Sequence, residues 1–174
     1  KLSTNTSFSS LYSVIGDYSM RTIVAGNYAI ANYSGILGHN PRTISFWFKR
    51  LNTYNISTNW NYLVDYGVAL DNKRFSIALE HDTEFLVVST KTDDSSGNGA
   101  LVYGSAIQDT RWHHCVVVLL PTYKYADGIR IYLDNVDDTK ISLNIDSEIN
   151  TSKSSSLTTD WLVLGSSSTT LGTK

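Results

Sequence analysis

Residues 43–49 read Thr43-Ile44-Ser45-Phe46-Trp47-Phe48-Lys49, with an apolar residue at every second position. Ile44, Phe46 and Phe48 fall on one face of an extended chain, and the other residues fall on the opposite face. Side chains of a β-strand alternate between the two faces of a sheet, so this period of two is typical of a strand with one buried face. The stretch predicts a half-buried strand of an antiparallel sheet.

The same alternation recurs along most of the chain, at residues 73–80 and 128–134. Runs that are apolar on both faces predict central strands, covered on each side. These runs are residues 85–88, 116–120 and 161–164. Weaker strand patterns occur at residues 11–15, 21–25, 28–32, 62–66, 99–107 and 140–144. No long window carries a helical stripe, and only a short helical turn is expected, near residues 123–126.

About ten to thirteen short strands separated by turn residues predict an all-β protein. We interpret residues 1–174 as a single domain, a two-sheet antiparallel jelly-roll sandwich. The sequence begins at Lys1 without a methionine, so we expect a segment of a larger protein.

Composition excludes several classes of protein and partner. Charged residues make up 17% of the chain and hydrophobic residues 41%, which is the reverse of a disordered chain. The net charge of −2 provides no field that would attract nucleic acid. No apolar run is long enough to insert into a membrane. The single cysteine, Cys115, cannot form an internal disulfide and is expected to be a small buried hydrophobe.

Four segments in order resemble the laminin-G-like, or concanavalin A-like, jelly-roll superfamily, over roughly residues 28–165. They are the strand at 43–49, Trp-His-His-Cys-Val-Val-Val at 112–118, Gly-Ile-Arg-Ile-Tyr-Leu-Asp-Asn at 128–135 and Leu-Val-Leu-Gly at 162–165. The resemblance pairs the second and third segments as antiparallel strands. Asp134-Asn135 is expected to close a turn where the family usually has Asp-Gly, because Asn tolerates positive φ.

Two departures from the family concern the edges of the sheets. The family usually has a closing strand after the Leu-Gly element, but residues 166–174 are not strand-like. Residues 1–27, in turn, precede the matching region. We expect either that this N-terminal segment supplies the closing strand or that the chain is cut short.

The superfamily includes lectins, carbohydrate-binding modules, adhesion domains and glycanases, so the fold alone does not select a function. The resemblance implies first a non-catalytic, lectin-like carbohydrate-binding module of a secreted or surface protein. The alternative is a structural or adhesion domain that binds protein partners, including one on a viral or phage particle. A retaining glycoside hydrolase comes third. The sequence does not indicate the oligomeric state.

Aromatic rings in polar loops are the candidate sugar-binding residues, because a flat ring stacks on a pyranose while nearby amides bond its hydroxyls. Trp60 has this setting, within Asn59-Trp60-Asn61-Tyr62. Tyr54, Tyr103, Tyr123 and Tyr125 are further candidates. Trp47, Trp112 and Trp161 lie in predicted strands and are expected in the core.

Glu80, Asp82 and Glu84 have the E-x-D-x-E spacing that retaining glucanases of the superfamily place on one face of a strand. Here His81 and Thr83 intervene where apolar residues should be. We therefore expect a hairpin turn between two strands and no catalytic role.

Calcium is the one cofactor that the resemblance suggests, because many relatives bind it in loops at the sandwich rim. Asp134, Asp137 and Asp138 cluster in one turn and are the candidate ligands, with Asp93-Asp94 in another turn. His113 and His114 are neighbours on a predicted strand and point to opposite faces, so they cannot bind one metal together.

Overall fold

The computed structural model describes residues 1–4, 6–11, 13–22, 27–50, 60–91, 98–153 and 162–165. Within them the chain forms short β-strands and one 3₁₀ turn, η1, at Ala126–Gly128. The strands are β1 (Thr6–Ser9), β2 (Ser19–Thr22), β3 (Ala29–Ile30), β4 (Arg42–Lys49), β5 (Asn61–Gly67), β6 (Arg74–Leu79), β7 (Phe85–Ser89), β8 (Leu101–Ala106), β9 (Trp112–Leu119), β10 (Ile129–Leu133), β11 (Val136–Asp137), β12 (Ile141–Leu143) and β13 (Val163–Leu164).

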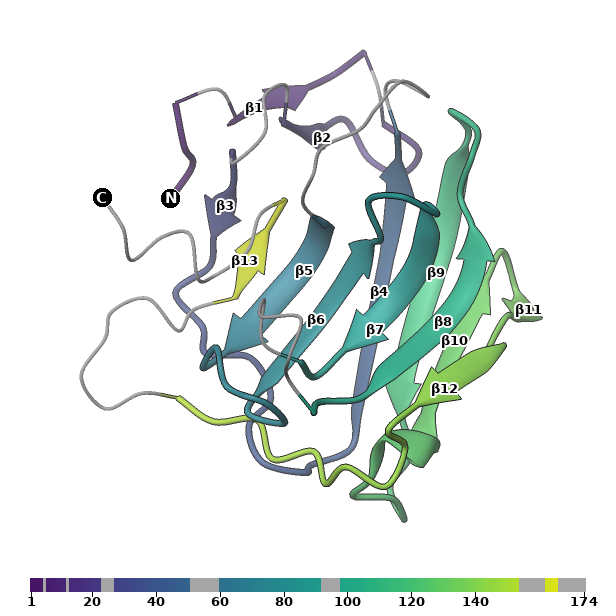
Figure 1. The fold of residues 1–174 in the computed structure, drawn as a ribbon. Helices are drawn as coiled ribbons and strands as arrows, with labels where there is room; N and C mark the ends of the chain where they lie inside the picture. The colour runs from purple at the N-terminus through teal and green to yellow at the C-terminus, as the bar shows by residue number, and fades with distance from the viewer. Residues whose placement is uncertain are drawn as a thin grey trace.

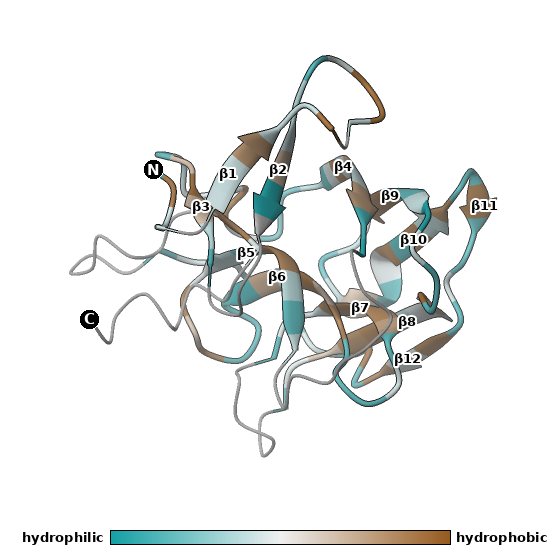
Figure 2. Ribbon diagram, turned by 90° about the horizontal axis from the view of Figure 1, so that it is seen from above, coloured by the Kyte–Doolittle hydropathy of each residue, from teal (hydrophilic) through white to brown (hydrophobic). Residues whose placement is uncertain are grey.

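Two antiparallel sheets face each other (Figures 1 and 2). One sheet has seven strands in the order β12-β8-β7-β6-β5-β13-β3, and the other has four in the order β11-β10-β9-β4. The hairpin of β1 and β2 forms a separate small sheet beside them. The predicted all-β, antiparallel architecture is confirmed.

The core lies between the two sheets and is built by the alternation seen in the sequence. Every second residue of β9 is buried, ending with Cys115, Val117 and Leu119. Phe75 and Ile77 of β6 belong to the same core cluster. The prediction that Cys115 is a small buried hydrophobe is confirmed, and its burial raises the pKa of the thiol to about 12.

Two expectations about burial in the four-stranded sheet are wrong. The β9 run was predicted to be covered on both faces, but Val116 and Val118 remain partly exposed because the four-stranded sheet has solvent on its outer side. Trp47 was expected in the core, yet it is 40% exposed on that outer face and stacks on His114, with ring centroids 4.9 Å apart. Trp112 is half-buried, and Trp161 lies outside the described residues.

The N-terminal segment contributes to one edge of the seven-stranded sheet. β3 pairs with β13, and Leu2 forms an isolated bridge to Ala29 on the far side. The Ile30 amide donates to the Lys1 carbonyl at 2.7 Å. Residues that precede Tyr28 therefore pair at this edge of the sheet, as one of the two expectations proposed (Figure 1). Residues 166–174 lie outside the described residues.

Local turns account for the remaining differences from the predicted strands. Residues 11, 14 and 15, within a stretch predicted to be extended, form bends between β1 and β2, where Gly16 has a φ of 73°. The Asp134-Asn135 turn is confirmed, with φ values of 50° and 69°, and it joins β10 to β11. Two positive φ values are the signature of a tight type I′ hairpin. β1 and β11 were not predicted.

Candidate functional site

One face of the seven-stranded sheet points away from the core and carries a row of side chains. The pairing registers align Tyr62 with Ala78, Ala78 with Val87, Val87 with Tyr103, and Tyr103 with Ile141. Directly paired residues project from the same face of a sheet. None of these five side chains belongs to the core cluster between the sheets. The outer face thus brings together two of the predicted sugar-binding residues, Tyr62 and Tyr103.

Trp60 extends this row at the start of β5. Its ring centroid lies 6.2 Å from that of Tyr62, and its side chain is half-buried. Asn61 pairs with Leu79, so the antiparallel register places Trp60 across from Glu80. Phe85, whose carbonyl accepts the Glu80 amide at 2.9 Å, follows on the next strand. We refer to Trp60, Tyr62, Phe85 and Tyr103 as the aromatic face.

A buried ion pair holds the Tyr62 end of the aromatic face in place. The Arg74 guanidinium lies 4.7 Å from the Tyr62 ring centroid. Arg74 also donates to both carboxylate oxygens of Asp65, at 2.7 and 2.8 Å. Neither side chain of this pair is exposed to solvent. A two-pronged bond of this kind fixes the plane of the guanidinium, and the plane in turn fixes the ring that stacks on it.

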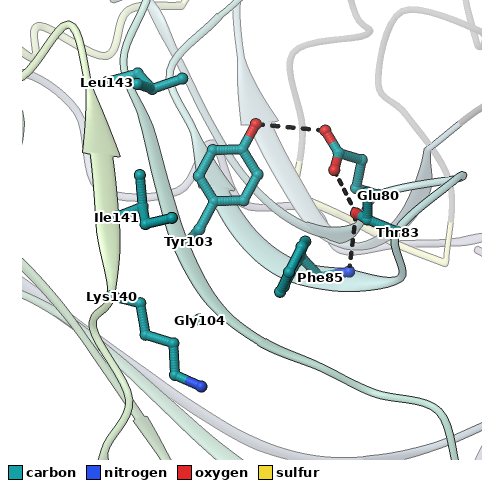
Figure 3. A pocket seen from close by; sticks show the side chains of 8 residues that line it. All are labelled: Glu80, Thr83, Phe85, Tyr103, Gly104, Lys140, Ile141 and Leu143. Carbon is teal, nitrogen blue, oxygen red and sulfur yellow. Dashed lines mark hydrogen bonds between the residues drawn. The ribbon is translucent and has the colours of Figure 1, made fainter.

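A pocket of about 300 Å³ opens at the other end of the aromatic face (Figure 3). Its walls are mainly apolar, from Phe85, Tyr103, Ile141 and Leu143, and Glu80 and Lys140 contribute charged groups. The Phe85 and Tyr103 rings meet edge to face, with centroids 6.2 Å apart. An apolar hollow with a few convergent polar groups is the usual form of a small-ligand site.

Hydrogen bonds fix the polar side of this pocket. The Tyr103 hydroxyl donates to Glu80 Oε1 at 3.3 Å, and the Thr83 hydroxyl donates to Glu80 Oε2. Burial, together with the charge of Glu80, raises the pKa of Tyr103 to about 12. Tyr103 therefore keeps its proton at neutral pH and remains a donor to Glu80.

The turn predicted for Glu80, Asp82 and Glu84 is confirmed. These residues connect β6 to β7, and Glu84 has a φ of 59°. Their carboxylates go to different partners: Glu84 to Arg50 at 2.6 Å and Asp82 to His81 at 2.6 Å. This segment therefore does not align three carboxylates on one face of a strand. That it has no catalytic role stays a prediction.

Two of the other predicted sugar-binding residues, Tyr123 and Tyr125, are not joined to the aromatic face. Tyr123 and Tyr125 lie between β9 and β10, at the lower end of the sandwich in Figure 1, whereas the β6–β7 turn is at the upper end. Both rings are exposed. Asn61 is exposed beside Trp60, and Asn59 and Tyr54 lie outside the described residues.

The three aspartates proposed for calcium each bond to protein groups. Asp138 accepts from the amide and hydroxyl of Ser105, and Asp137 accepts from the Thr139 amide. Asp134 turns instead toward the histidines of β9. Among the described residues no group of three or more His, Cys, Asp or Glu side chains is arranged to hold a metal ion. A calcium site stays a prediction of the sequence, and Asp93-Asp94 lies outside the described residues.

His113 lies between two carboxylates at one end of the four-stranded sheet. Its Nδ1 is 2.8 Å from Asp134 and its Nε2 is 2.9 Å from Asp109. Burial lowers the pKa of His113, but the hydrogen bonds to both aspartates outweigh it, and the net pKa is raised. The pKa of Asp109 is lowered by the Arg111 amide and by His113. Protonated His113 thus joins β9, the β10–β11 turn and the segment before β9.

We expect this cluster to make stability depend on pH. The pKa of His113 is higher in the folded protein than the value of 6.5 expected in the unfolded chain. Protonated His113 therefore contributes its full stabilisation below pH 6.5, and this stabilisation is lost as the pH rises through the pKa of the folded state. His113→Gln should cost about 1–2 kcal/mol of unfolding free energy at pH 6 and less at pH 9. Urea denaturation at both values measures this. The exposed His39, changed to Gln, is the control, and an equal cost of His113→Gln at both pH values contradicts the prediction.

Sequence reasoning missed the Asp65–Arg74 pair and Phe85 as parts of this site. A charged residue inside each of two neighbouring strand patterns was the available signal for the ion pair. No such signal marked Phe85, because its role depends on where the β7 strand lies beside β8.

Comparison with models of protein families gives a match over most of the chain. The family model described as the concanavalin A-like lectin/glucanases superfamily matches residues 24–173, a range that includes the strands from β3 to β13 and the whole aromatic face. A search of curated proteins gave no significant match. In the part of the chain that the structure describes, no helix has the length and apolar character needed to cross a membrane.

Proposed function

Because the chain belongs to the concanavalin A-like lectin/glucanase superfamily, we propose that it is a non-catalytic module that binds glycans on the aromatic face. The observation that carries the proposal is the gathering of four rings, from three strands and the residue before β5, on one outer face of one sheet. Phe85 is 36% exposed and the other three rings are partly exposed, so their accessible faces can contribute dispersion and C–H contacts to the apolar face of a sugar. The adjacent Glu80 carboxylate is an acceptor for sugar hydroxyls.

The state of the charged groups supports binding rather than catalysis. A retaining glycosidase needs two carboxyl groups about 5–5.5 Å apart, one of them a free general acid. Here Glu80 accepts from two hydroxyl groups, and Glu84 is paired with Arg50. Binding by stacking and hydrogen bonds is weak at one site and increases when modules are repeated in a larger protein. Such a module belongs on the cell surface or outside the cell.

We expect Trp60→Ala to weaken glycan binding about fivefold or more, because the loss of one stacking ring removes about 1 kcal/mol or more. The ligand is first found on a glycan array, and the affinity is then measured by calorimetric titration. Trp47→Ala is the matched control, because Trp47 is a solvent-accessible tryptophan that lies on the other sheet. An equal loss in both variants, or none in either, contradicts the assignment of the site.

A structural or adhesion domain is the second candidate. The hairpin of β1 and β2 favours it, because Phe8, Leu11 and Ile15 are 66%, 84% and 72% exposed. Exposed apolar residues that gather in one place are typical of surfaces that contact another protein. The absence of binding on the glycan array, together with a stable oligomer in light scattering, would favour this role. The domain would then act on the surface of a particle or cell.

A further inference from the structure

The pocket shares Phe85 and Tyr103 with the aromatic face and adds the aliphatic side chains of Ile141 and Leu143. The side chains of Phe85, Ile141 and Leu143 offer contact surface but no hydrogen bonds. Ile141 and Leu143 are 60% and 49% exposed, so their apolar surface is available to a ligand. A sugar ring covered with hydroxyls would lose hydration against such walls without recovering it. The pocket therefore suits an apolar substituent of a sugar.

The polar groups of the pocket determine which chemical group of the sugar can lie next to that substituent. Lys140 is turned to Asp138, with Nζ 3.4 Å from a carboxylate oxygen, so its charge is already balanced. Glu80 is bonded to the hydroxyls of Tyr103 and Thr83. A carboxylate accepts about four hydrogen bonds, so about two acceptor positions remain on Glu80. These acceptor positions favour a ligand with a neutral or positively charged hydrogen-bond donor and disfavour an anionic sugar.

We propose that the pocket binds the N-acyl group of an N-acylated amino sugar. The amide N–H of that group donates to Glu80, and its alkyl part lies against Phe85, Ile141 and Leu143. The acetamido group carries one N–H donor and one methyl group on the same carbonyl carbon, which matches a carboxylate beside an apolar wall. The inference rests on the proposed glycan-binding function and adds to it the class of sugar.

A series of ligands tests this without changing the protein. The methyl glycosides of glucose, glucosamine, N-acetylglucosamine and N-butanoylglucosamine, with the same galactose series, are titrated by NMR. We expect the N-acetyl sugar to bind about fourfold or more tighter than the parent hexose, since each buried methyl or methylene group contributes about that factor. The N-butanoyl sugar is expected to bind tighter still, because the 300 Å³ pocket has room for it.

Two variants locate the preference. Ile141→Ser and Leu143→Ser should each reduce the ratio between N-acetyl sugar and hexose toward one. Val136→Ser is the matched control, because Val136 is an aliphatic residue 65% exposed on β11, the strand before β12 in the sequence, and does not line the pocket. Unchanged unfolding midpoints show that all three variants are folded.

The outcomes separate this inference from the proposed function. Equal affinity for hexose and N-acetyl sugar, with binding still dependent on Trp60, overturns the inference and leaves glycan binding in place. A preference that survives both serine variants also overturns it. If none of the sugars binds and the glycan array is silent, both proposals fail.

Discussion

Asp65→Ala is expected to lower the free energy of unfolding by about 3–5 kcal/mol, the usual cost of removing one partner of a buried ion pair. The Arg74 guanidinium has no solvent exposure and loses its two-pronged bond to the carboxylate. A buried charge without its carboxylate is strongly destabilised, because water cannot reach it to replace the bond. Urea denaturation followed by tryptophan fluorescence measures the change.

A matched control and a double variant make this prediction specific. Asp146→Ala removes an exposed aspartate and should change stability by less than about 0.5 kcal/mol. Replacing Asp65 with Leu and Arg74 with Met together exchanges the pair for apolar groups, and it should recover most of the stability lost in the single variant. A loss of less than about 1 kcal/mol in Asp65→Ala would show that the pair is not buried as described.

The ion pair also connects stability to the candidate site. Because Arg74 stacks on Tyr62, we expect the folded double variant to leave that ring less well oriented. Its affinity for any glycan that the wild type binds should then decrease although the fold is kept. Undiminished binding by the double variant would show that Tyr62 needs no support from Arg74.

Arg42→Ala is expected to cost about 3 kcal/mol or more, because one side chain satisfies groups from several segments. Arg42 begins β4, yet its guanidinium donates to the Tyr66 hydroxyl at 3.2 Å and to the Thr151 hydroxyl at 2.9 Å. It also donates to the Gly38 carbonyl at 2.7 Å. These bonds connect the two sheets, since Tyr66 belongs to β5 of the seven-stranded sheet.

Arg42→Lys should recover only part of that stability, because one ammonium group cannot reproduce the spread of a guanidinium. Arg111→Ala is the control: its side chain is 80% exposed, and the change should cost less than about 0.5 kcal/mol. Thermal and urea unfolding of the three variants give the comparison. Full recovery by lysine would indicate that charge alone, rather than the shared hydrogen bonds, stabilises this junction.

The strands and the core follow closely from the order of residues. In β9 the alternation of apolar residues marks which side chains become buried, because a strand has only two faces and the core takes one. In β6 the same alternation predicted one buried face, but all six residues are buried. The β1–β2 region is less predictable. Leu11 and Ile15 are apolar like strand residues, but they lie in the connection between the two strands and remain exposed.

The candidate site was predictable only in part. Trp60 stands out because a tryptophan between two asparagines suits sugar binding, and Tyr62 and Tyr103 were chosen for similar reasons. Tyr123 and Tyr125 satisfied the same criterion but lie at the other end of the sandwich. The residues next to an aromatic ring in the sequence indicate whether the ring suits sugar binding. The neighbours of that ring in space depend on which strands pair and in which register.

Local alternation therefore specifies strands, buried positions and the all-β class, since these depend on residues one or two places apart along the chain. The aromatic face and its pocket depend on strands from Trp60 to Leu143 being placed side by side. Solvent exposure of Trp47 and burial of Arg74 were likewise settled by what packs against each strand. Packing depends on contacts between residues that are far apart in the sequence, so no short stretch of the chain determines it.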